Sequence, residues 1–74
     1  MKNHNFIDKE SMQEIGYALW QARQEKRLYL DKVQKATNIP QRIIDGMETG
    51  RKINYGALRK LLIFYEKNMR IVLK

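Results

Sequence analysis

Residues 28–52, LYLDKVQKATNIPQRIIDGMETGRK, decide the fold of this chain. Apolar side chains recur at helical spacing before and after a break at Asn38. Asn tolerates the left-handed conformation in which helices commonly end, and Pro40 suits the first turn of a following helix. The stretch therefore predicts a helix over residues 30–37, a tight turn, and a second helix over about residues 40–49.

The second of these helices has two chemically different faces. At 100° per residue, one face carries Pro40, Ile44, Met47 and Glu48. The opposite arc carries Arg42, Asp45, Gly46 and Thr49, with Gln41 and Ile43 at its flanks. In the major groove, Gln matches adenine and Arg matches guanine, so the polar arc is suited to DNA. The alternative is a merely solvated face.

Gly46 lies on the polar arc of this helix. Glycine costs about 1 kcal/mol relative to alanine inside a helix. The cost indicates that an external group, such as a phosphate or a thymine methyl, approaches the backbone at this position. The alternative is a weak glycine without a function. Gly50 is the residue type favoured just after the end of a helix. Two cationic residues, Arg51 and Lys52, follow it.

One helix is expected before this stretch and one after it. Ser11 and Glu14 match a capping box, which predicts that the first helix begins at residue 11 and ends near residue 26. Its predicted buried face is Ile15, Ala18, Leu19 and Ala22. Asn54 is expected to cap the last helix. The apolar stripe of that helix is Leu58, Leu61, Leu62 and Tyr65, and Ile63 and Phe64 widen it.

The last nine residues, 66–74, change to an alternating pattern that favours a strand. A single strand in a helical chain lacks a pairing partner, so we expect it to pair with the same strand of a second copy. The residues expected to form this homodimer contact are Ile63, Phe64, Met69, Ile71 and Leu73. The alternative is that the segment extends the last helix or frays. Residues 1–10 are expected to be a flexible N-terminal segment, and residues 11–65 the folded domain.

Composition excludes several classes of protein. A chain of 74 residues forms one domain with a marginal core. It has no Cys and a single His, so neither a disulfide framework nor a zinc site is expected, and no cofactor. Convergent catalytic groups are lacking, so we do not expect an enzyme. No apolar run has the length of a membrane span and no signal peptide is recognisable, which predicts a cytoplasmic protein without membrane contact.

The charge balance favours polyanions as partners. Fifteen Lys and Arg against eight Asp and Glu give a net charge of +7. Acids outnumber bases in residues 1–14, so the positive excess belongs to the rest of the chain. Charge alone does not separate nucleic-acid binding from a solubilising surface.

Residues 13–65 resemble the lambda-repressor and Cro family of helix-turn-helix proteins, of the XRE type. Within residues 28–52 the matching positions are Val33, Asn38, Gln41, Ile44, Glu48, Gly50 and Arg51; upstream they are Ile15, Leu19 and Arg23. Gln34 departs from the pattern, since it stands where the family has a small residue. The strand-like tail also stands in place of the family's fifth helix, as in antitoxin and plasmid-type members. The resemblance implies an all-α bundle of four to five helices that contains a helix-turn-helix.

The resemblance also implies roles for individual residues. Arg23 and Glu48 match a structural ion pair between the first helix and the end of the third. The expected base-reading residues, from the resemblance and from the polar arc, are Gln41, Arg42, Asp45 and Gly46. The expected phosphate contacts, from the resemblance and from charge, are Lys35, Thr49, Arg51, Lys52 and Arg59.

These expectations together describe a sequence-specific regulator of transcription. We expect a dimeric repressor, bacterial or phage-encoded and nucleoid-associated, that reads a pseudo-palindromic operator in double-stranded DNA through residues 40–49. The alternative is an antitoxin-like or protein-interaction module of the same fold, whose main partner is another protein such as a toxin. Exposed aromatic side chains would favour that alternative.

Overall fold

The computed structural model describes residues 8–66, which form four helices and, within that range, no strand. The helices are α1 (Lys9–Glu25), α2 (Leu30–Thr37), α3 (Gln41–Glu48) and α4 (Tyr55–Tyr65). The predicted all-α class is confirmed for this part of the chain. The predicted strand residues Met69, Ile71 and Leu73 lie outside the described residues.

The predicted start of the first helix at Ser11 is wrong, because α1 begins at Lys9. Its N-cap is Asp8, whose carboxylate accepts a hydrogen bond of 2.7 Å from the backbone N–H of Ser11. That hydrogen bond lowers the pKa of Asp8. Asp and Ser are equally good caps, and the upstream one is used here. Residues 9 and 10 therefore belong to α1 and not to a separate N-terminal segment.

The turn between α2 and α3 forms as predicted. Asn38 adopts the left-handed conformation, with φ of 64°, and its N–H donates to the carbonyl of Gln34. The hydroxyl of Thr37 donates to the Val33 carbonyl and accepts the N–H of Ile39. Ile39 is buried. The turn is therefore held by its own hydrogen bonds and by one side chain in the core.

The C-terminal end of α3 is closed by a Schellman motif. Gly50 is left-handed, with φ of 76°, as expected for a residue just past a helix end. Its N–H donates to the Met47 carbonyl at 3.0 Å, and the N–H of Arg51 donates to the Gly46 carbonyl at 2.9 Å. Asn54 caps α4 as predicted, because its side-chain oxygen accepts the N–H of Ala57. Both ends of the α3–α4 connection are thus fixed by hydrogen bonds, between backbone groups at α3 and from a backbone N–H to the Asn54 side chain at α4.

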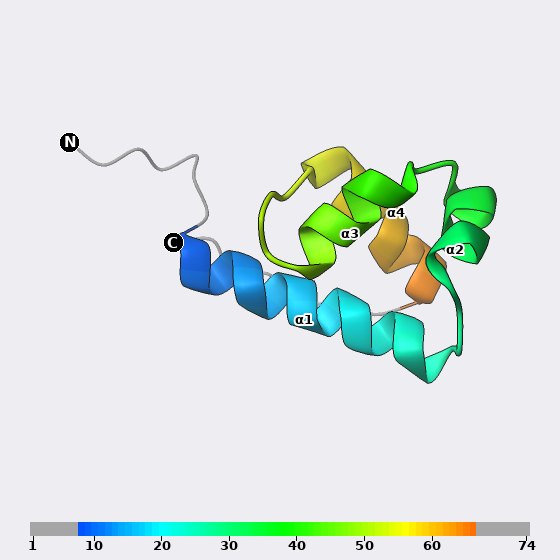
Figure 1. Cartoon of the computed structure of the whole chain (residues 1–74), viewed down its shortest axis with the longest axis horizontal. Coiled ribbons are helices and arrows are strands. Elements are labelled where there is room, and N and C mark those ends of the chain that lie inside the picture. Colours follow the sequence, from blue (N-terminus) through cyan, green and yellow to red (C-terminus); the bar gives the residue numbers. More distant parts are fainter. Residues whose placement is uncertain (1–7, 67–74) are drawn as a thin grey trace.

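The core lies where α1 and α2 contact both α3 and α4. In Figure 1, α3 lies between α1 and α2 on the side that faces the viewer, with α4 further away. The buried apolar side chains are Ile15, Leu19, Ala22, Val33, Ile39, Ile44, Met47, Ala57, Leu58, Leu61 and Tyr65. Ala18 and Leu62, also predicted to be buried, are only partly so. Among residues 8–66, no helix combines the length and apolar character required to cross a membrane.

Candidate nucleic-acid interface

α3 presents the polar face that its sequence predicts. Ile44 and Met47 are buried in the core, while Gln41 and Arg42 are exposed. Pro40 differs from the prediction, because it is the exposed N-cap of α3 and not part of the buried face. The reason is that Ile39, one residue earlier, occupies the core. The base-reading candidates at the start of α3 are therefore free to contact a ligand.

The N-terminus of α3 is capped by a residue from α2. Pro40 makes no side-chain cap hydrogen bond. Instead, the side-chain oxygen of Gln34 accepts the backbone N–H of Gln41 at 2.9 Å. Gln34 departs from the family pattern in the sequence, and its role was not predicted. The available signal was Pro40 itself, since a proline N-cap leaves the first amides of the helix in need of another acceptor.

The predicted ion pair between Arg23 and Glu48 is present and nearly buried. Arg23 Nε and Nη2 donate to the two carboxylate oxygens of Glu48 at 2.7 and 2.9 Å. The side chains are 11% and 4% exposed, respectively. Arg23 Nη1 also donates to the carbonyl of Leu28 at 2.9 Å. One guanidinium therefore connects α1, the α1–α2 connection and the end of α3.

Tyr65 lies close enough to this ion pair for its hydroxyl to be affected electrostatically. Burial, followed by the negative charge of Glu48, raises the pKa of Tyr65 to about 12, while Arg23 acts in the opposite direction. The Tyr65 hydroxyl is buried without a hydrogen-bond partner among the described residues. The hydrogen bonds with Glu48 raise the pKa of Arg23. The ion pair thus lies in largely buried surroundings, where charges interact more strongly than in water.

Gly16 allows α1 to approach α3 closely. A Cβ atom placed on Gly16 would overlap the backbone carbonyl oxygens of Met47 and Glu48, the latter at 2.7 Å. The contact lies at the last turn of α3, beside the Arg23–Glu48 ion pair. Sequence reasoning missed this role. The signal was a glycine next to buried Ile15 in the interior of a helix, where glycine is unfavourable.

Gly46, in contrast to Gly16, is not required by close contact with another helix. A Cβ atom placed there meets no atom within 4 Å, so the packing of the described residues does not require glycine. Its carbonyl accepts the N–H groups of Arg51 and Lys52. The close approach of an external group to Gly46 stays a prediction. Gly46 itself is buried, however, unlike the first two residues of α3, so the structure does not expose its backbone as the polar arc predicts.

The other predicted site residues at the end of α3 interact with each other. Arg51 Nη2 lies 3.0 Å from Asp45 Oδ2 in an exposed ion pair. The hydroxyl of Thr49 donates to the carbonyls of Asp45 and Gly46, at 3.0 and 3.2 Å. Because Thr49 has one hydroxyl proton, that proton is engaged inside α3 and not directed toward a phosphate.

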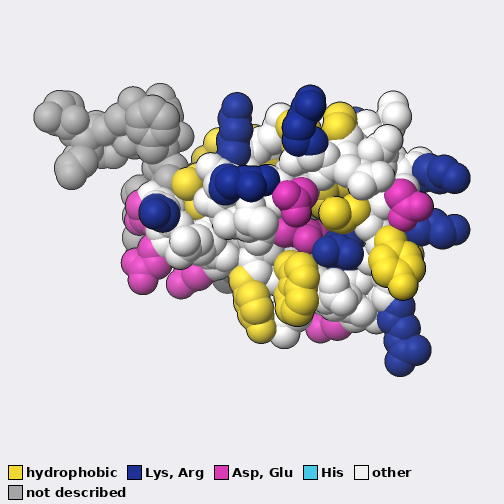
Figure 2. Space-filling view, in the orientation of Figure 1, with side chains coloured by type: hydrophobic (Ala, Val, Ile, Leu, Met, Phe, Trp, Pro, Cys, Tyr) yellow, Lys and Arg dark blue, Asp and Glu magenta, His cyan; other side chains and the backbone are white. Residues whose placement is uncertain are grey.

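The remaining phosphate-contact candidates extend the positive surface over neighbouring elements. Lys35 is exposed on α2, Lys52 on the α3–α4 connection and Arg59 on α4. Figure 2 shows Lys and Arg side chains over α3 and the connection after it, with Asp and Glu side chains among them at the centre of this face and a further acidic group at the N-terminal end of α1. The structure thus brings Asp45, Thr49 and Arg51 together at the end of α3. The cationic candidates Lys35, Lys52 and Arg59 lie apart, on α2, the α3–α4 connection and α4.

Comparisons with protein-family models, with curated proteins and with solved structures found no match. The functional assignment therefore depends on the geometry of α3 and its surroundings.

Proposed function

We propose that this protein is a sequence-specific DNA-binding regulator of transcription and that α2 and α3 form its helix-turn-helix. The observation that carries the proposal is the exposure of Gln41 and Arg42 on a helix whose opposite face is fixed in the core by Ile44 and Met47. Helix-turn-helix proteins contact bases with the N-terminal residues of the recognition helix. Gln41 and Arg42 are the first two residues of α3. The arrangement supports insertion of α3 into the major groove.

Contacts with the phosphates provide most of the affinity in this proposal. Lys52 lies in the connection that follows α3, and Lys35 and Arg59 are exposed on α2 and α4. Each Lys or Arg that neutralises a phosphate releases counterions, which makes binding dependent on salt. Such contacts position the protein without reading sequence, whereas Gln41 and Arg42 supply the specificity. The proposal includes a cytoplasmic site of action on DNA, in a protein encoded by a bacterium or a phage.

The first test is selection of bound sequences from a pool of random DNA duplexes at about 0.15 M salt. Enrichment of a two-fold symmetric motif supports a regulator that binds as a dimer. Binding without enrichment indicates a nucleoid-type protein that recognises only the DNA backbone. Absence of binding contradicts the proposal.

Arg42 and Lys52 are expected to respond differently to replacement by Ala. Arg42→Ala lowers the preference for operator over random DNA by about 1–3 kcal/mol, because a bidentate contact with guanine is lost. Lys52→Ala weakens binding to both DNAs and reduces the slope of log K against log salt by about one, because one phosphate contact is lost. Fluorescence anisotropy titrations at several salt concentrations measure both effects. Equal losses on both DNAs for Arg42→Ala would exclude it as a base reader.

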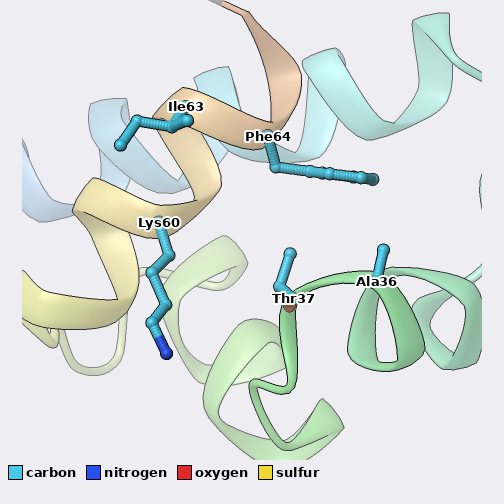
Figure 3. A pocket seen from close by; sticks show the side chains of 5 residues that line it. All are labelled: Ala36, Thr37, Lys60, Ile63 and Phe64. Carbon is cyan, nitrogen blue, oxygen red and sulfur yellow. The ribbon is translucent and has the colours of Figure 1, made fainter.

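The proposal includes a homodimer formed through the C-terminal end of α4. Figure 3 shows Phe64 of α4 over Ala36 and Thr37 of α2, with Lys60 and Ile63 of α4 further along a shallow, mainly apolar hollow of about 280 Å³. Ile63 is 69% exposed. A second copy that covers this apolar surface would form the proposed dimer. Binding to two half-sites then requires its two α3 helices to lie about 34–36 Å apart, one turn of DNA.

Removal of residues 67–74 tests this dimer. A chain that ends at Glu66 is expected to sediment as a monomer at concentrations at which the full chain is a dimer, because Met69, Ile71 and Leu73 are lost. Circular dichroism provides the control that the shortened chain retains its helices. If the shortened chain dimerises as tightly as the full chain, the tail does not form the interface.

A protein-interaction module is the second candidate, and one observation favours it. Tyr17 and Trp20 form an exposed stacked pair on α1, with ring centroids 5.9 Å apart. Hydrophobic side chains are visible over the middle of α1 in Figure 2. Exposed aromatic side chains are enriched where proteins bind one another. In this alternative, which includes an antitoxin-like role with a toxin as partner, the selection from random DNA yields no bound duplex.

A further inference from the structure

Arg51 follows α3 in the chain, but its guanidinium lies back over the polar face of α3. Its Nη2 is 3.0 Å from the carboxylate of Asp45, which shares that face with Arg42. We infer that Arg51 reads a base and that Asp45 is the positioning residue for this contact. The inference rests on the DNA-binding function proposed above, and it replaces the phosphate contact that the sequence predicts for Arg51.

The backbone of Arg51 is fixed relative to α3. Its N–H donates to the Gly46 carbonyl within the Schellman motif, and the preceding Gly50 supplies the left-handed conformation that this motif requires. The side chain of Arg51 therefore begins at a defined position beside the last turn of the recognition helix. The hydrogen bond to Asp45 then orients the far end of the side chain.

The surface next to this ion pair is open. Asp45 and Arg51 are 49% and 65% exposed, and a Cβ atom placed on Gly46 would meet nothing within 4 Å. The hydroxyl of Thr49 is directed at carbonyls of α3 and leaves this surface unoccupied. Gly46 itself is buried, so the accessible groups are the side chains of Asp45 and Arg51. The edge of a base pair can therefore approach the exposed side of this ion pair while Asp45 and Arg51 stay paired.

The charges of the pair suit a base edge better than a phosphate. A carboxylate next to a phosphate is repelled, whereas in the major groove Asp accepts from the amino group of cytosine and Arg donates to guanine. Asp45 uses one of the five N–H donors of the Arg51 guanidinium. Donors remain for a bidentate contact with guanine. The pair is thus complementary to a G·C base pair.

Arg51→Lys is the sharpest test, because Lys keeps the charge that a phosphate contact needs but loses the planar fork that guanine recognition needs. The DNAs are the selected operator, its single base-pair substitutions and a random duplex. We expect the ratio of operator to random affinity to fall roughly 5- to 140-fold. The loss should occur at one G·C pair of each half-site, whereas the affinity for random DNA should change less than about twofold.

Asp45→Asn and a matched control complete the experiment. Asp45→Asn is expected to lower discrimination at the same G·C pair and to strengthen binding to random DNA, because a negative charge is removed. Arg27→Lys makes the same substitution as Arg51→Lys at an exposed position in the α1–α2 connection. Arg27→Lys is expected to change neither the affinity for the operator nor the affinity for random DNA.

Two outcomes would overturn the inference, and they can be told apart. If the wild-type protein enriches a motif but Arg51→Lys weakens operator and random DNA equally, Arg51 contacts phosphate and only this inference fails. If the wild-type protein enriches no motif, the proposed function fails together with it.

Discussion

Glu48→Ala is expected to lower the free energy of unfolding by about 3–5 kcal/mol, because it leaves the buried guanidinium of Arg23 without a counter-charge. The whole stability of a small domain is typically about 5–15 kcal/mol, so this loss is a large fraction of it. Urea denaturation followed by circular dichroism measures the loss. The effect does not depend on contact with DNA, since the Glu48 side chain is 4% exposed.

Two controls separate this effect from a general response to lost charge. Asp45→Ala breaks the exposed pair with Arg51 and should cost no more than about 1 kcal/mol. Combining Arg23→Met with Glu48→Leu removes both charges and should recover most of the stability lost in Glu48→Ala. If Glu48→Ala costs no more than Asp45→Ala, the buried ion pair does not hold α3 in place.

Gly16→Ala is the second substitution with a large expected effect. The added Cβ would overlap backbone carbonyls of α3, which cannot move aside as the end of a flexible side chain can. Overpacking typically costs about 1–3 kcal/mol and occasionally more, and a clash with two backbone carbonyls belongs at the upper end of that range. Alanine gains about 1 kcal/mol in helix propensity, so the measured loss is the difference between the two effects. Thermal unfolding of the purified variant measures it.

Gly46→Ala is the matched control, because it makes the same change in the interior of another helix. No atom lies within 4 Å of the new Cβ there. The substitution is therefore expected to stabilise the protein by up to about 1 kcal/mol. The two glycine variants should change the melting temperature in opposite directions. A loss of similar size in both would contradict the role assigned to Gly16.

Local signals in the sequence predicted the two central helices well. Asn38 and Gly50 each end a helix in the left-handed conformation, and Asn54 caps α4. These signals depend on residues a few positions apart, so they can be recognised without the fold. The predicted start of α1 was wrong because Asp8 and Ser11 are both residues that cap helices well, and the helix is capped by Asp8. Local propensity alone does not rank them.

The contacts that orient α3 were predicted less completely because they join residues far apart in the chain. The Arg23–Glu48 pair was expected only through the resemblance to a family, since the two residues are 25 positions apart. The cap that Gln34 provides for α3 and the close contact at Gly16 were missed. Each depends on the exact distance between two helices, which periodicity does not give. The exposure of Gln41 and Arg42, in contrast, followed directly from helical spacing.

Arg23 binds both Glu48 of α3 and the carbonyl of Leu28. Under the proposed function as a repressor, a genetic screen for loss of repression should therefore return substitutions of Arg23 and Gly16 in α1, distant in sequence from the residues proposed to contact DNA. Their phenotypes should be temperature-sensitive and suppressible by stabilising changes elsewhere, whereas defects at Arg42 should persist at every temperature. This difference would separate two kinds of mutation. Substitutions of Arg23 or Gly16 displace α3, whereas substitutions of Arg42 remove a side chain that is proposed to contact a base.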